Sequence, residues 1–156
     1  MLNIQELRAK MIEAIRLTGT VIENDQLEIV DRGMPHKPSG LPAGKMGIYT
    51  FIYQDHFLKI GKAGPNSDAR FRSQHYNPLG SQSNLAKSIL NDIEFASQHI
   101  SIETVGEWIR QNTKRVDLFI NASLGIFVLN YFEAFLHLMY QPKYEGFDNQ
   151  RKIIGN

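Results

Sequence analysis

A single carboxylate, Glu133, stands within the otherwise apolar run LGIFVLNYFEAFLHLMY near the end of the chain. A carboxylate buried among such residues would cost several kcal/mol unless a cation or a metal ion pairs with it. At helical spacing, Glu133 shares one stripe with Asn130, His137 and Tyr140. Glu133 is therefore a candidate metal ligand. The simpler interpretation is that this stripe is the one face of a partly buried helix that meets solvent.

A phenol and an ammonium group, those of Tyr49 and Lys59, form a second candidate pair. The segments GIYTFIY and FLKIG around a QDH turn predict a β-hairpin over residues 46–61. If Phe51 pairs with Lys59, the register places Tyr49 and Lys59 on the same face of the hairpin. The ordinary alternative is a tyrosine half in the core, beside a lysine whose head reaches water.

A short helix predicted over residues 67–76 carries Arg70, with Arg72, His75 and Tyr76 close behind it. Two residues separated by one position point about 200° apart on a helix, so Arg70 and Arg72 cannot face the same site. A lone arginine on such a helix usually serves solubility. The helix alone therefore does not assign a role to Arg70.

Taken in order, these residues resemble the GIY-YIG nuclease superfamily over roughly residues 46–147. The resemblance rests on Gly47-Ile48-Tyr49, then Lys59-Ile60-Gly61-Lys62, then Arg70, Glu133 and Pro142. The first triplet matches letter for letter. The second reads KIG, with Lys59 where the family name has tyrosine, as in some restriction-type members. Where many members have asparagine, this chain has Glu145, and Asn149 stands slightly further on.

The resemblance implies a metal-dependent endonuclease that hydrolyses DNA phosphodiester bonds with one Mg²⁺ or Mn²⁺ ion. It implies Glu133 as the metal ligand and Arg70 as the contact to the scissile phosphate. Tyr49 and Lys59 are alternative general bases. Both groups titrate near pH ~10 in water, so either one needs a lowered pKa, which neighbouring cations would produce. His75 is the candidate for a supporting acid or base, and the expected substrate contacts are Lys62, Arg72, Tyr76 and Asn149.

Two alternatives remain open. One is a catalytically silent DNA-binding module on the same scaffold, which the departures at Lys59 and Glu145 favour. The other is an unrelated α+β protein, such as a small-ligand enzyme or an interaction domain, with a chance GIY triplet. In that case the side chains of Tyr49, Arg70 and Glu133 would not converge with Lys59 within about 10 Å, as groups that act on one reacting atom must.

A small α+β fold is expected to position these residues, with a three-stranded antiparallel sheet flanked by helices. The third strand is Arg115–Asn121, and helices are expected over residues 3–17, 67–76, 84–95, about 101–111 and 124–140. Residues 1–42 are predicted to be an N-terminal arm, made of a helix, short β-prone runs at 20–22 and 27–30, and a Pro/Gly-rich linker. Residues 43–156 are the predicted nuclease domain.

The composition limits the class of protein. The 156 residues are 42% hydrophobic and 21% charged, as in an ordinary globular domain, and the absence of cysteine excludes disulfides and thiolate metal sites. The N-terminus mixes charges into its apolar residues, unlike a signal peptide, and no run reaches the roughly 20 apolar residues of a membrane span. A net charge of +1 does not by itself indicate a nucleic-acid partner. We expect a cytoplasmic protein that binds DNA, does not associate with membranes, and forms a homodimer where both strands are cut at once.

Overall fold

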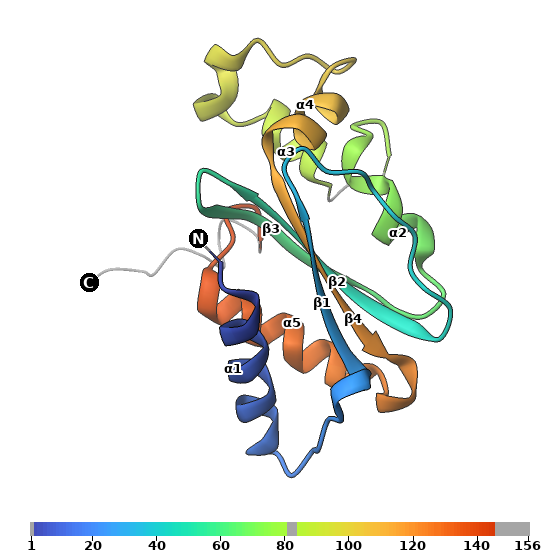
Figure 1. Ribbon diagram of the computed structural model, residues 1–156. Helices are drawn as coiled ribbons and strands as arrows, with labels where there is room; N and C mark the ends of the chain where they lie inside the picture. The colour runs from blue at the N-terminus through green and yellow to red at the C-terminus, as the bar shows by residue number, and fades with distance from the viewer. Residues whose placement is uncertain (1, 81–83, 146–156) are drawn as a thin grey trace, which may run out of the picture.

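The computed structural model describes residues 2–80 and 84–145 and has an α+β fold (Figure 1). The elements in chain order are α1 (Ile4–Arg16), η1 (Asn24–Gln26), β1 (Leu27–Gly33), β2 (Lys45–Tyr53), β3 (His56–Ala63), α2 (Asp68–Arg72), η2 (Gln74–Tyr76), α3 (Leu85–Leu90), η3 (Ile93–Gln98), α4 (Val105–Asn112), β4 (Lys114–Asn121), η4 (Ala122–Leu124) and α5 (Ile126–Tyr140). Within the described residues, no helix is both long enough and apolar enough to cross a bilayer.

The sheet has four antiparallel strands in the order β1-β4-β2-β3, which corrects the expected three-stranded sheet. The additional strand is β1, whose first residues were predicted to be a β-prone run of the N-terminal arm. It pairs with β4 from Leu27 opposite Ile120 onward. Without β1, the backbone N–H and C=O groups of β4 that point away from β2 would have no hydrogen-bond partner, and unpaired buried backbone groups are costly. The earlier run at 20–22 forms no strand.

The sheet separates two apolar clusters. On one face, α1 and α5 pack Leu7, Met11, Leu129 and Phe132 against the strands. On the other face lie α2, α3 and α4, which pack against the opposite side of β2 and β4. Figure 1 shows this division, with α1 and α5 on one side of the sheet and α2 on the other. The segment predicted to be an N-terminal arm therefore contributes a strand to the sheet and a helix to the core on one face of that sheet.

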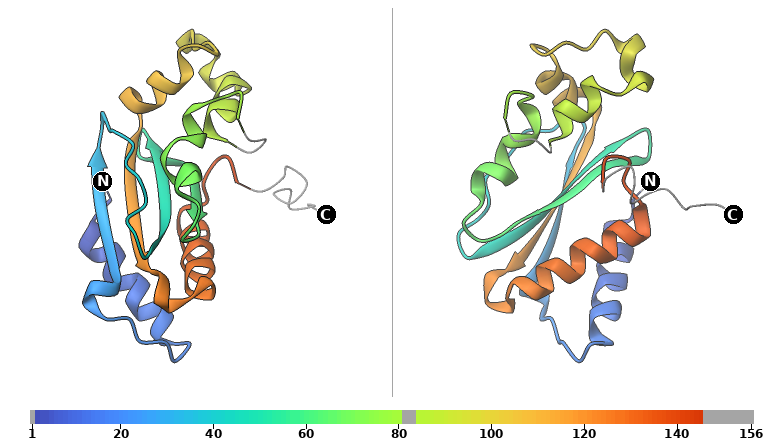
Figure 2. Two further views of the ribbon diagram at one scale, coloured as in Figure 1. Left: turned by 90° about the vertical axis from the view of Figure 1, so that its right-hand side faces the viewer. Right: turned by 180° about the vertical axis from the view of Figure 1, so that it is seen from behind.

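The β2–β3 hairpin has the register that the sequence indicated. Phe51 lies opposite Lys59, and Tyr49 lies opposite Gly61. Because side chains alternate across a strand, Tyr49, Phe51 and Lys59 share the face toward α2, whereas Ile48 and Ile60 face α5. The right-hand view in Figure 2 shows the hairpin running between α2 and α5. The hairpin therefore brings one set of side chains to each of these helices.

The apolar helix α5 ends where the sequence predicted. Its C-terminal neighbour Gln141 takes a left-handed conformation, with φ of 43°, and Pro142 follows and cannot continue the helix. The chain then turns alongside β3, where the backbone N–H groups of Lys143 and Tyr144 donate to the carbonyls of Phe57 and Leu58 at 2.9 Å each. We call residues 141–145 the strap. It carries Glu145 back toward the hairpin.

Candidate functional site

The phenol of Tyr49 crosses β3 over a glycine. A Cβ atom placed on Gly61 would lie 2.4 Å from the Tyr49 hydroxyl oxygen and 2.6 Å from its ring carbon Cζ, so only glycine leaves room for the phenol. The ring is fully buried, with Phe71 and His75 beside it at centroid distances of 6.0 Å and 4.4 Å. The Tyr49 hydroxyl is thereby held at the edge strand, at the centre of the predicted site.

Arg70 lies next to that hydroxyl. Its Nε donates to the Tyr49 oxygen at 3.4 Å, and the Arg70 residue is otherwise exposed. This hydrogen bond and the nearby carboxylates of Glu133 and Glu145 raise the pKa of Arg70 above its ordinary value. Among the described residues, Arg70 has no salt bridge to a carboxylate. Its guanidinium is therefore a fixed cation available to an anionic ligand.

The pKa of Tyr49 lies above its ordinary value. Burial is the main cause, and the charges of Glu145 and Glu133 add to it, whereas the hydrogen bond from Arg70 acts in the opposite direction. Arg70 does lower this pKa, as expected of a neighbouring cation, but the desolvation of a fully buried phenol outweighs its effect, so the net pKa is raised. Tyr49 is a neutral phenol in this structure.

Glu133 projects from α5 toward β3 and forms an ion pair with Lys62. Its side chain is 18% exposed, so the carboxylate is partly buried, as its apolar surroundings predicted. The neighbouring stripe residues also face the hairpin: a ring nitrogen of His137 lies 3.1 Å from the Ile60 carbonyl oxygen, and Tyr140 stacks on Phe57. Three residues of the predicted stripe therefore contact β3, whereas Asn130 at its N-terminal end is exposed.

Glu145 reaches Lys59 from the strap. Its Oε1 lies 3.2 Å from the Lys59 Nζ, and the Lys59 side chain is only 5% exposed. A buried ammonium group needs such a partner. The strap that delivers Glu145 is fixed by Lys143, which forms ion pairs with Asp92 and Glu94 at 2.6 Å and 2.5 Å.

His75 is buried beside these groups, 2% exposed, and neither ring nitrogen has a hydrogen-bond partner among the described residues. Burial, together with the charges of Lys59, Arg115 and Arg70, lowers the pKa of His75 to about 3. The ring is therefore neutral at physiological pH. The structure brings His75 to the site as a packing group against Tyr49 and Phe51, and an acid role for it would require a proton that this environment opposes.

Because His75 is buried with a lowered pKa, the free energy of unfolding should fall as the pH is lowered. Because its folded-state pKa lies below the unfolded value of about 6.5, the unfolded chain binds the extra proton first as pH falls. At pH 5 this single group should reduce the free energy of unfolding by about 2 kcal/mol relative to pH 7.5. His75→Phe should remove that loss, as measured by urea unfolding at both pH values. His56→Gln, at the exposed first residue of β3, is the control; an unchanged acid dependence in His75→Phe would contradict the assignment.

Two of the expected substrate contacts lie away from this convergence. Arg72 points to Asp68 at 3.2 Å, as the helical geometry predicted for one of the two arginines. Tyr76 is buried, and its hydroxyl accepts a hydrogen bond from Arg115 at 2.8 Å and lies 2.9 Å from a ring nitrogen of His36. Asn149 lies outside the described residues.

A buried polar network supports the helix that carries Arg70. Arg115 is fully buried; its Nε donates to Asp117 at 2.7 Å, one terminal nitrogen donates to Tyr76, and the other donates to the Phe71 carbonyl at 2.8 Å. Asp117 also accepts from Arg32 of β1 at 3.0 Å. The network therefore connects β1 and β4 to the residue directly after Arg70.

The sequence analysis did not assign these supporting residues. Arg115 and Asp117 stand two apart in an apolar strand, and opposite charges at that spacing lie on one face and indicate a buried ion pair. Glu145 was noted only as a departure from the family pattern. The role of Gly61 depends on its cross-strand partner, Tyr49. The predicted hairpin register places these two residues opposite each other, so that register was enough to identify the role of Gly61.

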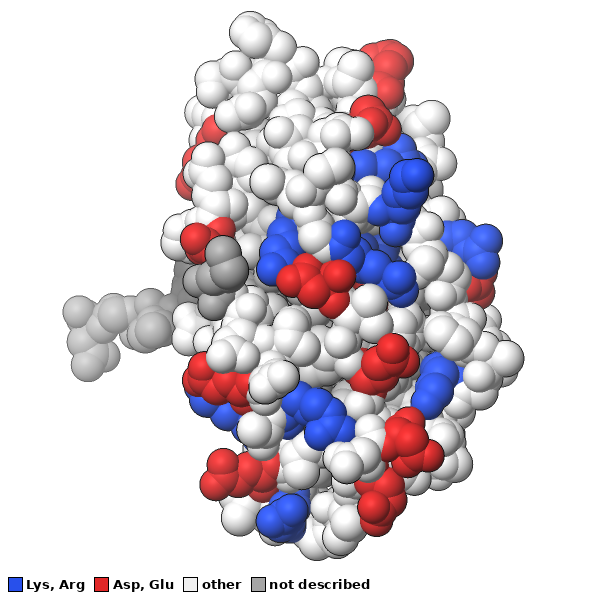
Figure 3. All heavy atoms as spheres, viewed as in Figure 1, with Lys and Arg blue, Asp and Glu red and all other residues white. Residues whose placement is uncertain are grey.

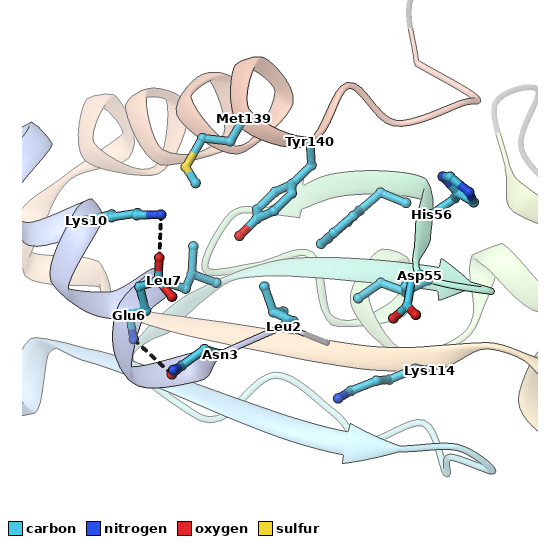
Figure 4. A pocket seen from close by; sticks show the side chains of 12 residues that line it. Leu2, Asn3, Glu6, Leu7, Lys10, Asp55, His56, Lys114, Met139 and Tyr140 are labelled. Carbon is cyan, nitrogen blue, oxygen red and sulfur yellow. Dashed lines mark hydrogen bonds and ion pairs between the residues drawn. The ribbon is translucent and has the colours of Figure 1, made fainter.

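The site is an open edge and not one of the two cavities at the hairpin turn. One cavity of about 500 Å³ lies between α1, the turn and the end of α5, as Figure 4 shows. Its rim carries the Glu6–Lys10 ion pair together with Asp55 and Lys114, and none of the converging side chains lines it. The strap covers this edge at Phe57 and Leu58, and the converging side chains lie further along β3.

Six polar side chains lie together at the β3 edge, and they come from β2, β3, α2, α5 and the strap. Five were predicted from the sequence and the sixth is Glu145: Tyr49, Lys59, Lys62, Arg70, Glu133 and Glu145. Within the described residues, no group of three or more histidine, aspartate or glutamate side chains forms a ready metal cage. In comparisons with known proteins, no family model matches this chain, and no curated protein or solved structure matches it either.

Proposed function

We propose that this chain is a DNA endonuclease of the GIY-YIG type that hydrolyses phosphodiester bonds with one divalent metal ion. The observation that supports it best is the meeting of Tyr49, Arg70 and Glu133 at the β3 edge, with Lys59 and Lys62 beside them. These residues come from four separate elements. A chance GIY triplet gives no reason for them to converge.

The donor set fits a single hard cation. Glu133 offers one partly buried carboxylate, and Mg²⁺ commonly uses one or two protein carboxylates, with water and phosphate oxygens as its other ligands. Lys62, which neutralises Glu133 in this structure, would release it when the ion is held. A bound ion would supply positive charge beside the phosphate.

Arg70 and Tyr49 are the groups assigned to the reacting atoms. The exposed Arg70 guanidinium would bind a non-bridging phosphate oxygen and stabilise the charge that develops during in-line attack. The Tyr49 oxygen, fixed by Arg70 and by the gap at Gly61, would accept a hydrogen bond from the attacking water. Lys59 is paired with Glu145, so it has no lone pair to accept a proton while that ion pair persists. Tyr49 is therefore the better placed of the two groups to orient the attacking water, and with its raised pKa it would act as the base only where a bound metal ion favours the phenolate.

A catalytically silent DNA-binding module is the second candidate, and one observation favours it. Lys62 already satisfies the Glu133 carboxylate, so this side chain needs no metal ion to be stable in its place. The surface does not decide between the two functions. On the face shown in Figure 3, Lys and Arg side chains gather over the end of β1 and the segment after it, with Asp and Glu side chains among them.

Incubation of the purified protein with supercoiled plasmid and Mg²⁺ or Mn²⁺ tests the proposal. We expect nicked or linear product, its loss with EDTA, and its loss in Glu133→Gln protein purified in the same way. Cutting that persists in Glu133→Gln would contradict the role of Glu133. A folded wild-type protein that retards DNA in gels but never cuts it would establish the silent module instead.

A further inference from the structure

The charges at the β3 edge are almost balanced. Among the described residues, the site contains three cations (Lys59, Lys62 and Arg70) and two carboxylates (Glu133 and Glu145), a net charge of +1. Each lysine is paired with one carboxylate, which leaves Arg70 as the cation without a carboxylate partner. Tyr49 and His75 add no charge, because the pKa of the phenol is raised and that of the imidazole is lowered.

Glu145 is placed where it controls this balance. It comes from the strap and not from the helix or strands that carry the other groups, and the backbone bonds of Lys143 and Tyr144 to β3 fix its approach. The Tyr144 hydroxyl donates to Asp92 at 2.5 Å, which fixes the strap a second time. Glu145 pairs with the nearly buried Lys59, and its charge also acts on Arg70 and Tyr49.

We infer that Glu145 is a specificity-determining residue that adjusts the site to a phosphodiester monoanion and against a phosphomonoester dianion. This inference rests on the proposed function and deepens it. The Glu145 charge lowers the positive potential at the ligand whether or not a metal ion is bound, and the loss of binding free energy is about twice as large for a terminal phosphate dianion as for a diester monoanion. The site is thereby fitted to internal phosphates of a strand and disfavours strand ends, free nucleotides and inorganic phosphate.

If Glu145 acts through its charge, its removal should change the affinities for a phosphate dianion and for a phosphate monoanion in a fixed ratio. Removing the charge of Glu145 raises the positive potential at the ligand by the same amount for any ligand bound there. The gain in binding free energy is proportional to the ligand charge, so the logarithm of the affinity gain should be about twice as large for a dianion as for a monoanion. A steric effect or a lost hydrogen bond has no reason to follow this ratio.

Methyl phosphate and dimethyl phosphate are the matched probes. At pH 8 the monoester is a dianion, because the second pKa of a phosphomonoester is about 6, and the diester is a monoanion. Titrations followed by amide chemical shifts, in EDTA and at low ionic strength, give both dissociation constants without any need for cutting. For Glu145→Gln we expect about a tenfold tighter binding of methyl phosphate and about a threefold tighter binding of dimethyl phosphate.

Two further variants separate charge from disruption. Glu28→Gln removes an exposed carboxylate on β1, the strand at the opposite border of the sheet, and it should change either affinity less than about twofold. The double variant Lys59→Met with Glu145→Gln restores the net charge to +1 and should return the ratio of the two affinities to that of the wild type. It also serves where Glu145→Gln alone folds poorly, because the buried ammonium is then absent.

Equal gains for the two probes, or no gain for either, would overturn the inference. So would a double variant that keeps the tenfold preference. The titration is independent of the plasmid assay: a protein that shows the expected charge relation but never cuts DNA supports the role of Glu145 and refutes hydrolysis. A protein that cuts DNA without this relation supports hydrolysis and refutes the role of Glu145.

Discussion

Gly61→Ala should reduce DNA cutting by about 100-fold and lower the free energy of unfolding by about 1–3 kcal/mol. The added methyl group would lie 2.4 Å from the Tyr49 hydroxyl oxygen, far inside contact distance. The ring cannot easily retreat, because it is fully buried against Phe71 and His75. The phenol must therefore shift away from Arg70, and a displacement of about 1 Å at a reacting group is enough for a loss of this size.

Gly64→Ala is the matched control for Gly61→Ala. A Cβ atom at Gly64 would meet nothing within 4 Å, and the backbone there is not in the left-handed region. This variant should keep wild-type cutting and stability, as measured by the initial rate of plasmid nicking and by urea unfolding. Full activity in Gly61→Ala would show that the position of the Tyr49 hydroxyl is not required for hydrolysis.

Asp117→Asn should lower the free energy of unfolding by about 3–5 kcal/mol. Asp117 and Arg115 are both fully buried, and their side chains are 2.7 Å apart. The substitution leaves the Arg115 guanidinium buried without a counter-charge, and the second bond to Asp117, from Arg32, is weakened as well. The same change should loosen the Phe71 carbonyl contact, and with it the position of Arg70.

Asp31→Asn provides the comparison for Asp117→Asn. Asp31 pairs with Lys114 at 2.6 Å across the same two strands, but the two side chains are 37% and 27% exposed. A partly exposed pair of this kind contributes about 0–1 kcal/mol, so the variant should unfold near the wild-type denaturant concentration. If guanidinium unfolding shows the same small loss for both variants, the buried pair does not stabilise the fold as its burial implies.

Local sequence patterns were enough to predict most of the elements. The Asn3 side chain accepts hydrogen bonds from the N–H groups of Gln5 and Glu6, as a helix N-cap does, and α1 begins at the next residue. The hairpin register and the end of α5 also followed from alternation and from Pro142, whereas α5 begins two residues later than predicted, at Ile126. Each of these signals lies within a few residues of the structure that it specifies.

The missed features depend on pairing between distant segments. Nothing local in Leu27–Gly33 shows that it joins β4, which lies some eighty positions further on and supplies its partners. The meeting of Glu145 with Lys59 depends likewise on the path of the strap after α5. The net rise in the Tyr49 pKa was missed for a related reason: charges can be counted in a sequence, whereas the burial that outweighs them appears only when the fold is complete.

The strap also affects how copies of this protein can associate. A sheet edge with free N–H and C=O groups is a template for strands of other molecules, and it promotes aggregation. Here the backbone of Lys143 and Tyr144 occupies part of the outer edge of β3, and the register shift between Asp31 and Gly33 makes the opposite edge irregular. A continuous intermolecular sheet is therefore disfavoured at both borders. A homodimer that positions two active edges on opposite DNA strands would have to form through helices or loops and leave the sheet borders unpaired.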